Sequence, residues 1–582
     1  MKFSRLADYM KSIEDTSSRN DMTGILSRLF TEAESDEIGN LCYLLQGRVA
    51  PQYEAVEFGI ADKLLIRAIA QAYEIEVDEV TRAFKEKGDL GIAAQELVKS
   101  RKRATHIDKE YSVSQVFELL LKLASTSGEG SQDEKILIIS NLLHALDPLS
   151  VRYVVRIPLD KLRLGFSDMT ILDAFSWMLT GDKSHRGELE RAFNVRPDIG
   201  YIATAIKQHG IGGISRVHAR IGAPILAALC QRIPTADEMI EKMGEVAVEP
   251  KYDGVRVQIH YRASTHPRVS ASVSAFSRNL ENTTAMYPEL SGIGEELNAT
   301  EVILDCEAVG FDRESGQLAT FQETMTRKRK HDIEETSKRM PLKFFVFDIL
   351  YKDGEDLLST PLRERKAILE KTLAPKIRIT QSPFILTKDP KELREYHDEQ
   401  LAKGLEGVVI KKWDSGYEPG RKNYSWVKFK EEEGKTGKLT DTIDAVIMGY
   451  SRGEGKRSGF GIGMFLVGVR TEEGYVTVTK IGTGVTDEMW KSLNNSLETI
   501  QVKDMPKEYK DVNKQFLPDV WVAPKIVVEI AGDDLTKSST HGAGIAVRFP
   551  RLVRIRNDKS PAQATTVEEL RTMFGTQKQS TV

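Results

Sequence analysis

The sequence predicts a helical domain, then a strand-rich domain, then a small β-barrel. Two changes along the chain predict this order, one in hydrophobic periodicity and one in the turns between strands. Up to about residue 220, apolar residues recur every three or four positions, which is the spacing of amphipathic helices. From about residue 245, apolar and polar residues alternate in short segments typical of strands. After residue 441 the short strands are separated by glycine-rich turns, the pattern of a small barrel.

Individual segments support each part of this prediction. The first helical stripe follows Asn20 or Asp21, either of which is a suitable N-cap. The helical stripes are Met22, Ile25, Leu26 and Leu29; Leu65, Ile69, Ala72 and Tyr73; and Val116, Leu119, Leu120 and Leu123. The predicted strands include "EVILDCEAVGF", "LKFFVFDILY", "GVVIKKW" and "SWVKFK", then "DAVIMGY", "GMFLVGV", "YVTVTKIG" and "KIVVEIAG". Between the two groups, the charged stretch "KEEEGKTGKLTD" is expected to be a linker.

Length and composition narrow the class of protein. A chain of 582 residues is too long for one core, and 40% apolar with 29% charged residues is ordinary for a globular protein. The cysteines Cys42, Cys230 and Cys306 have no pairing or metal-ligand spacing, which predicts a reducing compartment. We see no apolar run like that of a signal peptide or membrane span, so we expect a cytoplasmic protein without a membrane partner. The net charge of -4 does not by itself favour an anionic partner.

One lysine stands at an unusual place in the strand-rich region. In "VAVEPKYDGVRVQIHY", Lys251 lies between two segments that are predicted to be strands, before the turn pair Asp253-Gly254. The second segment alternates apolar and polar residues, which predicts a half-buried strand with its polar side chains facing water. A lysine at a turn usually only reaches into solvent, so Lys251 alone would be weak support for a site.

Other charged residues at strand ends strengthen the case. Glu307 and Glu406 could together hold a hard cation, because carboxylates are its preferred ligands. Lys428 and Lys430 share one face of a predicted strand, where they would repel each other unless a phosphate lay between them. The positive charge of these two lysines would lower the pKa of a third lysine nearby, so that its uncharged amine could act as a nucleophile. The combination predicts phosphoryl or nucleotidyl transfer through Lys251.

These residues lie in motifs that resemble a known superfamily. "KYDGVR", "FSRN", "LDCEAV", "FVFDIL", "EGVVIK" and "VKFK" occur in the order typical of covalent nucleotidyltransferases, which include polynucleotide ligases and messenger-RNA capping enzymes. One KxDG would occur by chance, whereas six ordered motifs are very specific.

The flanking segments resemble one branch of this superfamily. "GDLGIAAQEL" and "KLRLGFSDMTILDAF" are similar to the helical DNA-binding domain of archaeal and eukaryotic replicative ATP-dependent DNA ligases, and "FQETMTRKRKHD" matches the same group. "VWVAPKIVVEIAGDDLTKS" and "RFPRLVRIRNDKSPAQATT" resemble its oligonucleotide/oligosaccharide-binding (OB) barrel. The resemblance implies an all-helical DNA-binding domain at 1–220, an α+β adenylation domain with antiparallel sheets at 221–433, and an OB-fold barrel at 434–582.

The resemblance also implies roles for single residues. Lys251 matches the nucleophile that carries AMP, and Glu307 and Glu406 match the metal-binding carboxylates. The implied nucleotide-binding residues are Glu249 at the adenine amino group, Arg256 at the ribose, Arg278 toward the 5'-phosphate of a nick, Glu307, Phe347 stacked on adenine, Lys411, the phosphate-binding pair Lys428 and Lys430, and Arg554 and Lys559 at the leaving pyrophosphate. Pro250 replaces the aromatic residue often found before the lysine.

The implied activity is sealing of 5'-phosphate/3'-hydroxyl nicks in duplex DNA, with ATP and Mg²⁺, in replication, repair and recombination. We expect a monomer. A sliding clamp is a further candidate partner, but "VKSRKRATHIDKEYSV" lacks the paired aromatic residues of a clamp-binding segment. The alternatives are an RNA ligase or capping enzyme, which shares the core chemistry, and a non-catalytic DNA-binding scaffold. The scaffold would not need Lys251, Glu307 and Glu406 together.

Overall fold

The computed structural model of the chain has two compact units, Met1–Phe429 and Lys430–Val582. It describes residues 1–100, 110–264, 271–312, 317–319, 324, 337, 339–374, 378–420, 422–430, 441–453, 460–532 and 534–579, with only the backbone of 422, 430 and 576–579. Most of the predicted linker, the segment 321–332 and the segment around 101–109 lie outside the described residues. No helix of the described residues is long and apolar enough to cross a membrane.

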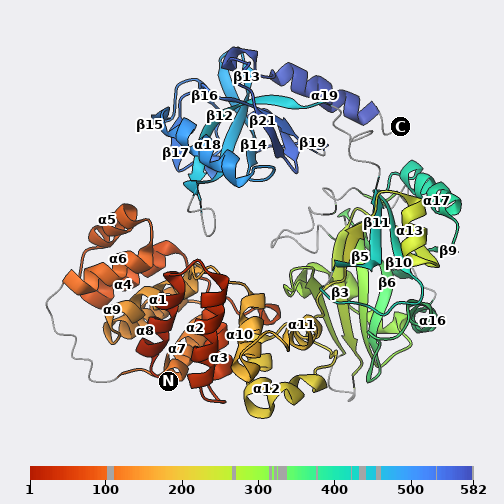
Figure 1. Cartoon of the computed structure of the whole chain (residues 1–582), viewed down its shortest axis with the longest axis horizontal. Coiled ribbons are helices and arrows are strands. Elements are labelled where there is room, and N and C mark those ends of the chain that lie inside the picture. Colours follow the sequence, from red (N-terminus) through yellow and green to blue (C-terminus); the bar gives the residue numbers. More distant parts are fainter. Residues whose placement is uncertain are drawn as a thin grey trace. The chain divides into compact units, whose positions relative to one another are not determined.

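The first unit begins with a layered bundle of helices (Figure 1). They are α1 (Phe3–Glu14), α2 (Arg19–Glu32), α3 (Ile38–Leu45), α4 (Asp62–Tyr73), α5 (Val77–Lys87), α6 (Leu90–Ser100), α7 (Val113–Ser125), α8 (Ser131–His144), α9 (Pro148–Arg156), α10 (Asp168–Thr180), α11 (Arg186–Val195) and α12 (Ile199–His209). The predicted stripes supply the core: Leu26, Ile69 and Leu120 are at most 1% exposed. Helix α2 begins earlier than predicted, because Ser18, not Asn20 or Asp21, accepts the capping hydrogen bond from the Asp21 N–H.

A buried ion pair joins the loop before α6 to α9. Asp89 accepts hydrogen bonds from Arg156 Nε at 3.1 Å and Nη2 at 2.9 Å. Gly91 lies so close to α9 that a Cβ there would be 2.5 Å from the Arg152 carbonyl oxygen. The glycine of "GDLG" therefore permits the close packing of these two helices.

Two sheets follow in the same unit. One has the order β1-β11-β10-β2-β9, with β1 (Leu229–Arg232), β2 (Val246–Pro250), β9 (Ile385–Thr387), β10 (Gly407–Lys412) and β11 (Lys422–Lys430). The other has the order β4-β3-β5-β6-β7, with β3 (Val255–Arg262), β4 (Ser272–Ser277), β5 (Glu301–Gly310), β6 (Leu342–Lys352) and β7 (Glu355–Asp356), and β8 (Ile379–Gln381) pairs with β6. The helices α13 (Ala236–Met243), α16 (Leu362–Thr372) and α17 (Pro390–Ala402) complete this α+β part.

Strand β3 is more buried than its alternating sequence predicts. Gln258 is 6% exposed and His260 is fully buried, so the expectation of a half-buried strand was wrong. The segment that connects the helices to the sheets covers the polar face: the Gly222 N–H donates to His260 Nδ1, and Ile225 exchanges two hydrogen bonds with the Gln258 amide. Period-two patterning cannot distinguish solvent from a polar loop as the partner of such side chains.

The second unit is the predicted OB-fold barrel. The meander β12 (Ile443–Arg452), β13 (Ile462–Thr471) and β14 (Gly474–Ile481) precedes α18 (Asp487–Glu498), and the chain then returns to β12 through β17 (Val520–Val522) and β18 (Val527–Ala531). Strand β18 pairs in turn with β21 (Arg551–Ile555). The remaining elements are β15 (Gln501–Val502), β16 (Tyr509–Lys510), β19 (Asp534–Lys537), β20 (Ile545–Arg548) and α19 (Val567–Gln579). Phe465 and Trp490 lie at the centre of the core.

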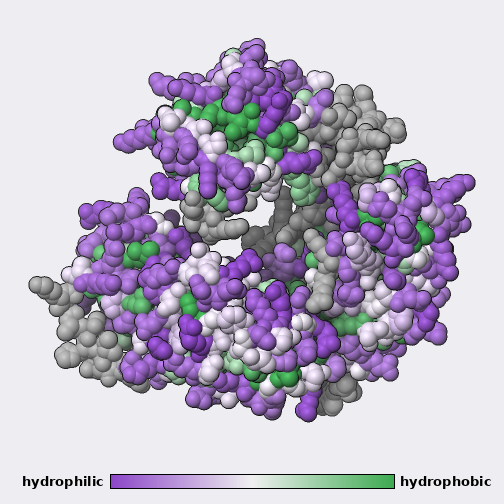
Figure 2. Space-filling model, viewed as in Figure 1, coloured by the Kyte–Doolittle hydropathy of each residue, from purple (hydrophilic) through white to green (hydrophobic). Residues whose placement is uncertain are grey.

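Hydrophilic residues predominate on the face of each unit that Figure 2 shows, and hydrophobic residues there form only small groups.

The order of the elements and the pairing of the strands confirm the fold class predicted from the sequence: a helical region, an α+β region with antiparallel sheets, and a C-terminal barrel.

Candidate nucleotide-binding site

Backbone pairing brings Lys251 and Glu406 together. Lys251 directly follows β2 and Glu406 directly precedes β10, and these two strands are antiparallel. The Lys251 N–H donates to the Gly407 carbonyl at 2.9 Å, and the Glu406 N–H donates to the Lys251 carbonyl at 3.2 Å. Their side chains form an ion pair between Nζ and Oε2, and each is 23% exposed. The lysine at the bend is therefore held and oriented.

The second sheet contributes Arg256 and Glu307, which face each other across the β3–β5 pairing. Arg256 is anchored by Asp305, which accepts from its Nη2 at 2.6 Å and its Nε at 3.0 Å. The Tyr417 hydroxyl also donates to Asp305, at 2.7 Å. The Arg256 guanidinium is thus fixed by a carboxylate and a hydroxyl that sequence reasoning missed.

Burial gives Glu307 an unusual proton affinity. It raises the pKa of the Glu307 carboxyl to about 8, against the lowering effect of the positive charges on Arg256 and Lys251. The negative charges of Asp305 and Glu406 raise the pKa further. Glu307 thus lies within electrostatic reach of both Lys251 and Glu406, and a cation at this position would release its proton.

Aromatic rings and a buried lysine lie beside these charges. Phe347 of β6 and Trp426 of β11 meet edge to face, with ring centroids 5.8 Å apart. Lys411 of β10 places Nζ 4.5 Å from the Phe347 ring centroid and 4.2 Å from that of Trp426. Trp426 belongs to the predicted strand "SWVKFK", where period two puts it on the same face as Lys428, but it was not singled out from the sequence.

Glu249 is buried at the end of β2, with an exposure of 2%. Its Oε1 lies 2.9 Å from Lys411 Nζ and 2.7 Å from Lys366 Nζ. Burial lowers the pKa of Lys411 to about 8, and the charge of Lys366 lowers it further while Glu249 opposes the shift. Lys366 was not singled out from the sequence, because a lysine on an amphipathic helix is normally exposed.

Four cationic side chains converge near Cys230 of β1. Burial raises the pKa of its thiol, whereas the charges of Arg256, Lys411, Lys251 and Lys428 lower it. As predicted, Val427 and Phe429 face the apolar cluster on the opposite side of β11 from Lys428. The Lys430 side chain lies outside the described residues.

The other predicted site residues lie elsewhere. Arg278 is exposed in the turn after β4. Arg554 and Lys559 belong to the second unit, where they contact Glu529 at 2.6 Å and Asp444 at 2.5 Å. The structure therefore places Lys251, Glu249, Arg256, Glu307, Phe347, Glu406, Lys411 and Lys428 in one region of the first unit.

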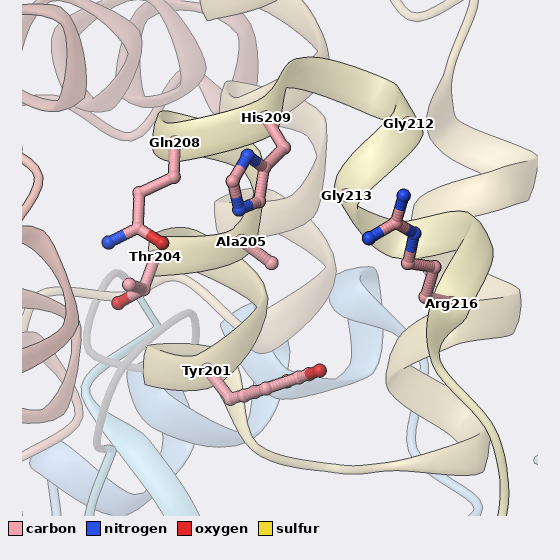
Figure 3. A pocket seen from close by; sticks show the side chains of 8 residues that line it. All are labelled: Tyr201, Thr204, Ala205, Gln208, His209, Gly212, Gly213 and Arg216. Atoms are coloured by element: carbon pink, nitrogen blue, oxygen red, sulfur yellow. The ribbon is translucent and has the colours of Figure 1, made fainter.

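A hollow of about 460 Å³ lies between α12 and the short helix Gly210–Arg216 (Figure 3). The side chains of Tyr201, His209 and Arg216 line it, together with Gly212 and Gly213.

The stretch around this hollow is positively charged. Between Asp198 and Asp237 the sequence contains no acidic residue, although it contains Lys207, Arg216, Arg220 and Arg232. This positively charged stretch was not recognised from the sequence, because its four cations are spaced too widely to look like a cluster.

Comparison with known proteins decides which family combines these features. The model of the ATP dependent DNA ligase domain matches residues 224–430, the DNA ligase N terminus matches 2–176, and the ATP dependent DNA ligase C terminal region matches 458–559. A probable DNA ligase of Dictyoglomus thermophilum is 42% identical over 100% of this chain and 99% of its own. The chain belongs to the ATP-dependent DNA ligases.

Other ligases agree over the full length. DNA ligase 2 of Thermofilum pendens is 37% identical over 100% of this chain and 98% of its own, and DNA ligase 1 of Methanosarcina mazei is 36% identical over 98% and 99%. The solved structure named Pmar-Lig_Pre covers 95% of this chain and 99% of its own at 17% identity with a TM-score of 0.54, which shows the shared fold. The protein is thus a ligase that uses ATP and acts on DNA, and the RNA ligase, capping enzyme and scaffold alternatives lose their support.

The ligase residues described above fit ATP and a hard cation. Glu249 Oε1 is buried without a well-aligned hydrogen bond to another described residue, so it has acceptor capacity for a base amino group. The converging cations suit a triphosphate. The described residues contain no group of three His, Cys, Asp or Glu that could hold a metal alone. Glu307 and Glu406 instead suit Mg²⁺, which takes one or two carboxylates and completes its shell with substrate phosphates and water.

Proposed function

We propose that this ligase seals nicks through a covalent adenylate on Lys251. The observation that carries the proposal is the position of Lys251 Nζ, which lies against Glu406 and within electrostatic reach of Glu307, at the junction of two strands. A lysine that only stabilised the turn would not need two carboxylates near it, Glu406 at the start of β10 and Glu307 within β5. These three groups instead match the requirements of transfer to a nitrogen nucleophile.

In the first step, the deprotonated Nζ of Lys251 attacks the α-phosphorus of ATP. A nitrogen–phosphorus bond forms, the bond to the bridging oxygen of the β-phosphate breaks, and pyrophosphate leaves with the electron pair. Arg256 is held by Asp305 on the ribose side, and Lys428 adds positive charge for the phosphates. Positioning accounts for most of the acceleration, because the anhydride supplies the driving force.

In the later steps, AMP moves from Lys251 to the 5'-phosphate of the nick, which converts that phosphate into an anhydride. The 3'-hydroxyl then attacks the 5'-phosphorus, the new phosphodiester bond forms and AMP leaves. We propose Arg278 as the contact to the 5'-phosphate, since it is exposed in a turn where DNA can reach it.

Base recognition is proposed for Glu249 and Phe347. The Glu249 carboxylate accepts a hydrogen bond from the adenine amino group, and the Phe347 ring stacks on the base. Lys411 lies between them and links the carboxylate to the ring. Mg²⁺ at Glu307 and Glu406 would neutralise charge on the α-phosphate.

The helical region is proposed to hold the duplex through phosphate contacts, since such contacts position DNA without reading its sequence. The acid-free stretch after Asp198, with Arg216 beside the hollow, supports a contact there. The domain limits 1–220, 221–433 and 434–582, the monomeric state and the cytoplasmic location stay predictions. Clamp binding is not proposed, because its candidate segment lacks paired aromatic residues.

One experiment tests the proposal directly. The protein is incubated with α-labelled ATP and Mg²⁺, and the labelled lysine is identified by peptide mapping. We expect label on Lys251, released as AMP when nicked duplex DNA is added. Parallel reactions with nicked RNA separate DNA ligation from RNA ligation. Label on a different residue, or sealing without a covalent adduct, would refute the proposal.

A further inference from the structure

Lys366 is a buried cation that none of the recognised motifs contains. It lies on α16, is 3% exposed, and places Nζ 2.7 Å from Glu249 Oε1. An ammonium group loses its hydration when it is buried, so its retention requires a compensating partner. Glu249 is that partner, and Glu249 is also the proposed reader of adenine.

The position of Lys366 is fixed by its own helix. Its neighbour Arg365 is 1% exposed and forms a bidentate ion pair with Asp348 of β6, at 2.7 and 3.0 Å. Arg365 also donates to the Ser415 carbonyl at 3.2 Å. Helix α16 is therefore anchored to β6 and to the loop after β10, and Lys366 meets Glu249 from a rigid support.

The contact between Lys366 and Glu249 is electrostatic more than it is a directional hydrogen bond. Although the two atoms are close, neither Lys366 Nζ nor Glu249 Oε1 has a well-aligned hydrogen-bond partner among the described residues. The Glu249 carboxylate is thus held by a charge while its capacity to accept a hydrogen bond remains. A buried acceptor of this kind is complementary to an N–H donor of a ligand.

Lys411 cannot replace Lys366 in this task. Its Nζ also donates to the Phe347 carbonyl at 3.1 Å and lies between the Phe347 and Trp426 rings. Burial lowers its pKa to about 8, so it loses much of its charge in mildly alkaline solution. Lys366 therefore supplies the second positive charge that holds the Glu249 carboxylate in place.

We propose that Lys366 is a positioning residue for base selection, which holds the Glu249 carboxylate and directs it to the exocyclic amino group of adenine. The inference rests on the proposed role of Glu249. An ionised carboxylate only accepts hydrogen bonds, so it favours a base with an amino group at this position. A protonated carboxyl would also donate and would lose that preference.

The test compares ATP with purine riboside triphosphate, which lacks the amino group, in single-turnover adenylation of Lys251. For Lys366→Met we expect the preference for ATP to fall by about tenfold or more, mainly through a higher KM for ATP, because one buried charge-assisted hydrogen bond is worth at least this much. Use of the analogue should hardly change. Lys366→Arg should restore most of the preference, since it restores the charge.

Three further variants make the result decisive. Lys135→Met is the matched control, because Lys135 is also a buried lysine, bonded to the Phe58 carbonyl in the helical region, and its loss should leave the preference intact. The double variant Lys366→Met, Glu249→Gln removes both charges of the ion pair, so that neither charge is left buried without the other. If Lys366→Met is unstable, the double variant is compared with Glu249→Gln instead. We expect the two to show the same preference for ATP over the analogue.

The outcomes separate the inference from the function on which it rests. If Glu249→Gln abolishes the preference for ATP while folded Lys366→Met retains it, the role of Lys366 is refuted and that of Glu249 stands. If Glu249→Gln also retains the preference, the proposed adenine contact itself is wrong. Equal losses with ATP and the analogue in Lys366→Met would show a structural role only.

Discussion

Glu406 has two proposed duties at one position. It pairs with the Lys251 ammonium in the structure, and it is proposed to bind Mg²⁺ when ATP is present. The two duties exclude each other while the ion pair is closed, so the proposal requires this pair to open before Glu406 binds Mg²⁺.

Lys251→Ala is expected to abolish the covalent adenylate and leave the fold intact. Lys251 is partly exposed and packs little, so its truncation leaves no cavity. The measurement is gel detection of labelled protein, with thermal unfolding as the check on folding. Lys412→Ala is the control, since Lys412 is exposed at the end of β10. An adduct on another lysine in Lys251→Ala would contradict the assignment.

Glu307→Ala and Glu406→Ala are each expected to slow adenylation more than tenfold, which is about 1.4 kcal/mol or more in the barrier. Both carboxylates lie near Lys251 and are proposed to hold Mg²⁺. Adenylation rates are measured over a range of Mg²⁺ concentrations. Glu301→Ala is the control on the same strand, because Glu301 pairs with Arg262 away from the site. Wild-type rates at saturating Mg²⁺ in both variants would remove these carboxylates from the metal site.

Single residues differ in how far the sequence reveals them. Lys251, Glu307 and Glu406 could be proposed because they stand in ordered motifs. Lys251 and Glu406 lie at strand ends as expected, whereas Glu307 lies within β5, so its predicted position at a strand end was wrong. Tyr417 and Lys366 could not, since each acts through a partner distant in the sequence: Asp305 for Tyr417 and Glu249 for Lys366. Local periodicity contains no information on such pairs.

At the scale of elements, β3 shows the same limit. Its alternation correctly predicts a strand, but the choice of solvent for the polar face fails because the segment around Gly222 and Ile225 covers it. The His260 ring accepts from the Gly222 N–H through Nδ1 and contacts the Gln258 amide oxygen through Nε2 at 2.9 Å. This arrangement requires a neutral imidazole.

Stability is therefore expected to fall in acid through His260. Burial lowers the pKa of its imidazole to about 3, from about 6.5 in an unfolded chain. Between these values only the unfolded state binds the proton, so the free energy of unfolding decreases as pH falls below about 6.5 and this loss ends near 3. Urea unfolding at several pH values measures the slope. His260→Gln, which cannot titrate, should flatten it, and His218→Gln, at an exposed position, should not. An unchanged slope in His260→Gln would contradict the prediction.

The α12 region is expected to contribute to DNA affinity. Arg216 is exposed at the border of the hollow, where its guanidinium can reach a phosphate. Arg216→Ala should weaken binding to nicked duplex and reduce the salt dependence by about one counterion, while adenylation of Lys251 is unchanged. Fluorescence anisotropy at several salt concentrations measures both effects. Arg186→Ala, which removes an exposed arginine paired with Asp173, is the matched control. Equal affinities for the two variants would exclude this surface from the DNA contact.

For the whole molecule, the division of residues between two units has a mechanistic consequence. The residues proposed to bind the base, ribose and α-phosphate lie in Met1–Phe429, whereas Arg554 and Lys559 lie in Lys430–Val582. The two units must therefore meet for Arg554 and Lys559 to act on the triphosphate. Sequence patterns predicted the three regions, because the first differs from the others in periodicity and a charged linker separates the last two, but these patterns contain no information on when the units meet.

Within the barrel, Arg554 and Lys559 already have carboxylate partners. Arg554 is 61% exposed and contacts Glu529, and Lys559 contacts Asp444, which also pairs with Arg556. The Arg554–Glu529 pair is open to solvent on the arginine side and so contributes little stability, whereas Lys559 is 31% exposed beside a largely buried Asp444. We expect a triphosphate to compete with both carboxylates for these cations. We therefore expect the barrel to stabilise the leaving pyrophosphate in the first step and to contribute much less afterwards, when no pyrophosphate remains.

The double variant Arg554→Ala, Lys559→Ala tests whether the barrel acts mainly in the first step. Adenylation of Lys251 should slow strongly, because two charges that stabilise the leaving group are gone. Sealing of a nick that already carries AMP should slow far less, with any residual loss reflecting weaker DNA contact. Single-turnover rates of the two reactions are measured separately. Lys491→Ala, Lys503→Ala removes two exposed lysines of the same unit and controls for net charge. Equal decreases in the two rates would mean that this segment only binds DNA, and the proposed role at the leaving pyrophosphate would then be wrong.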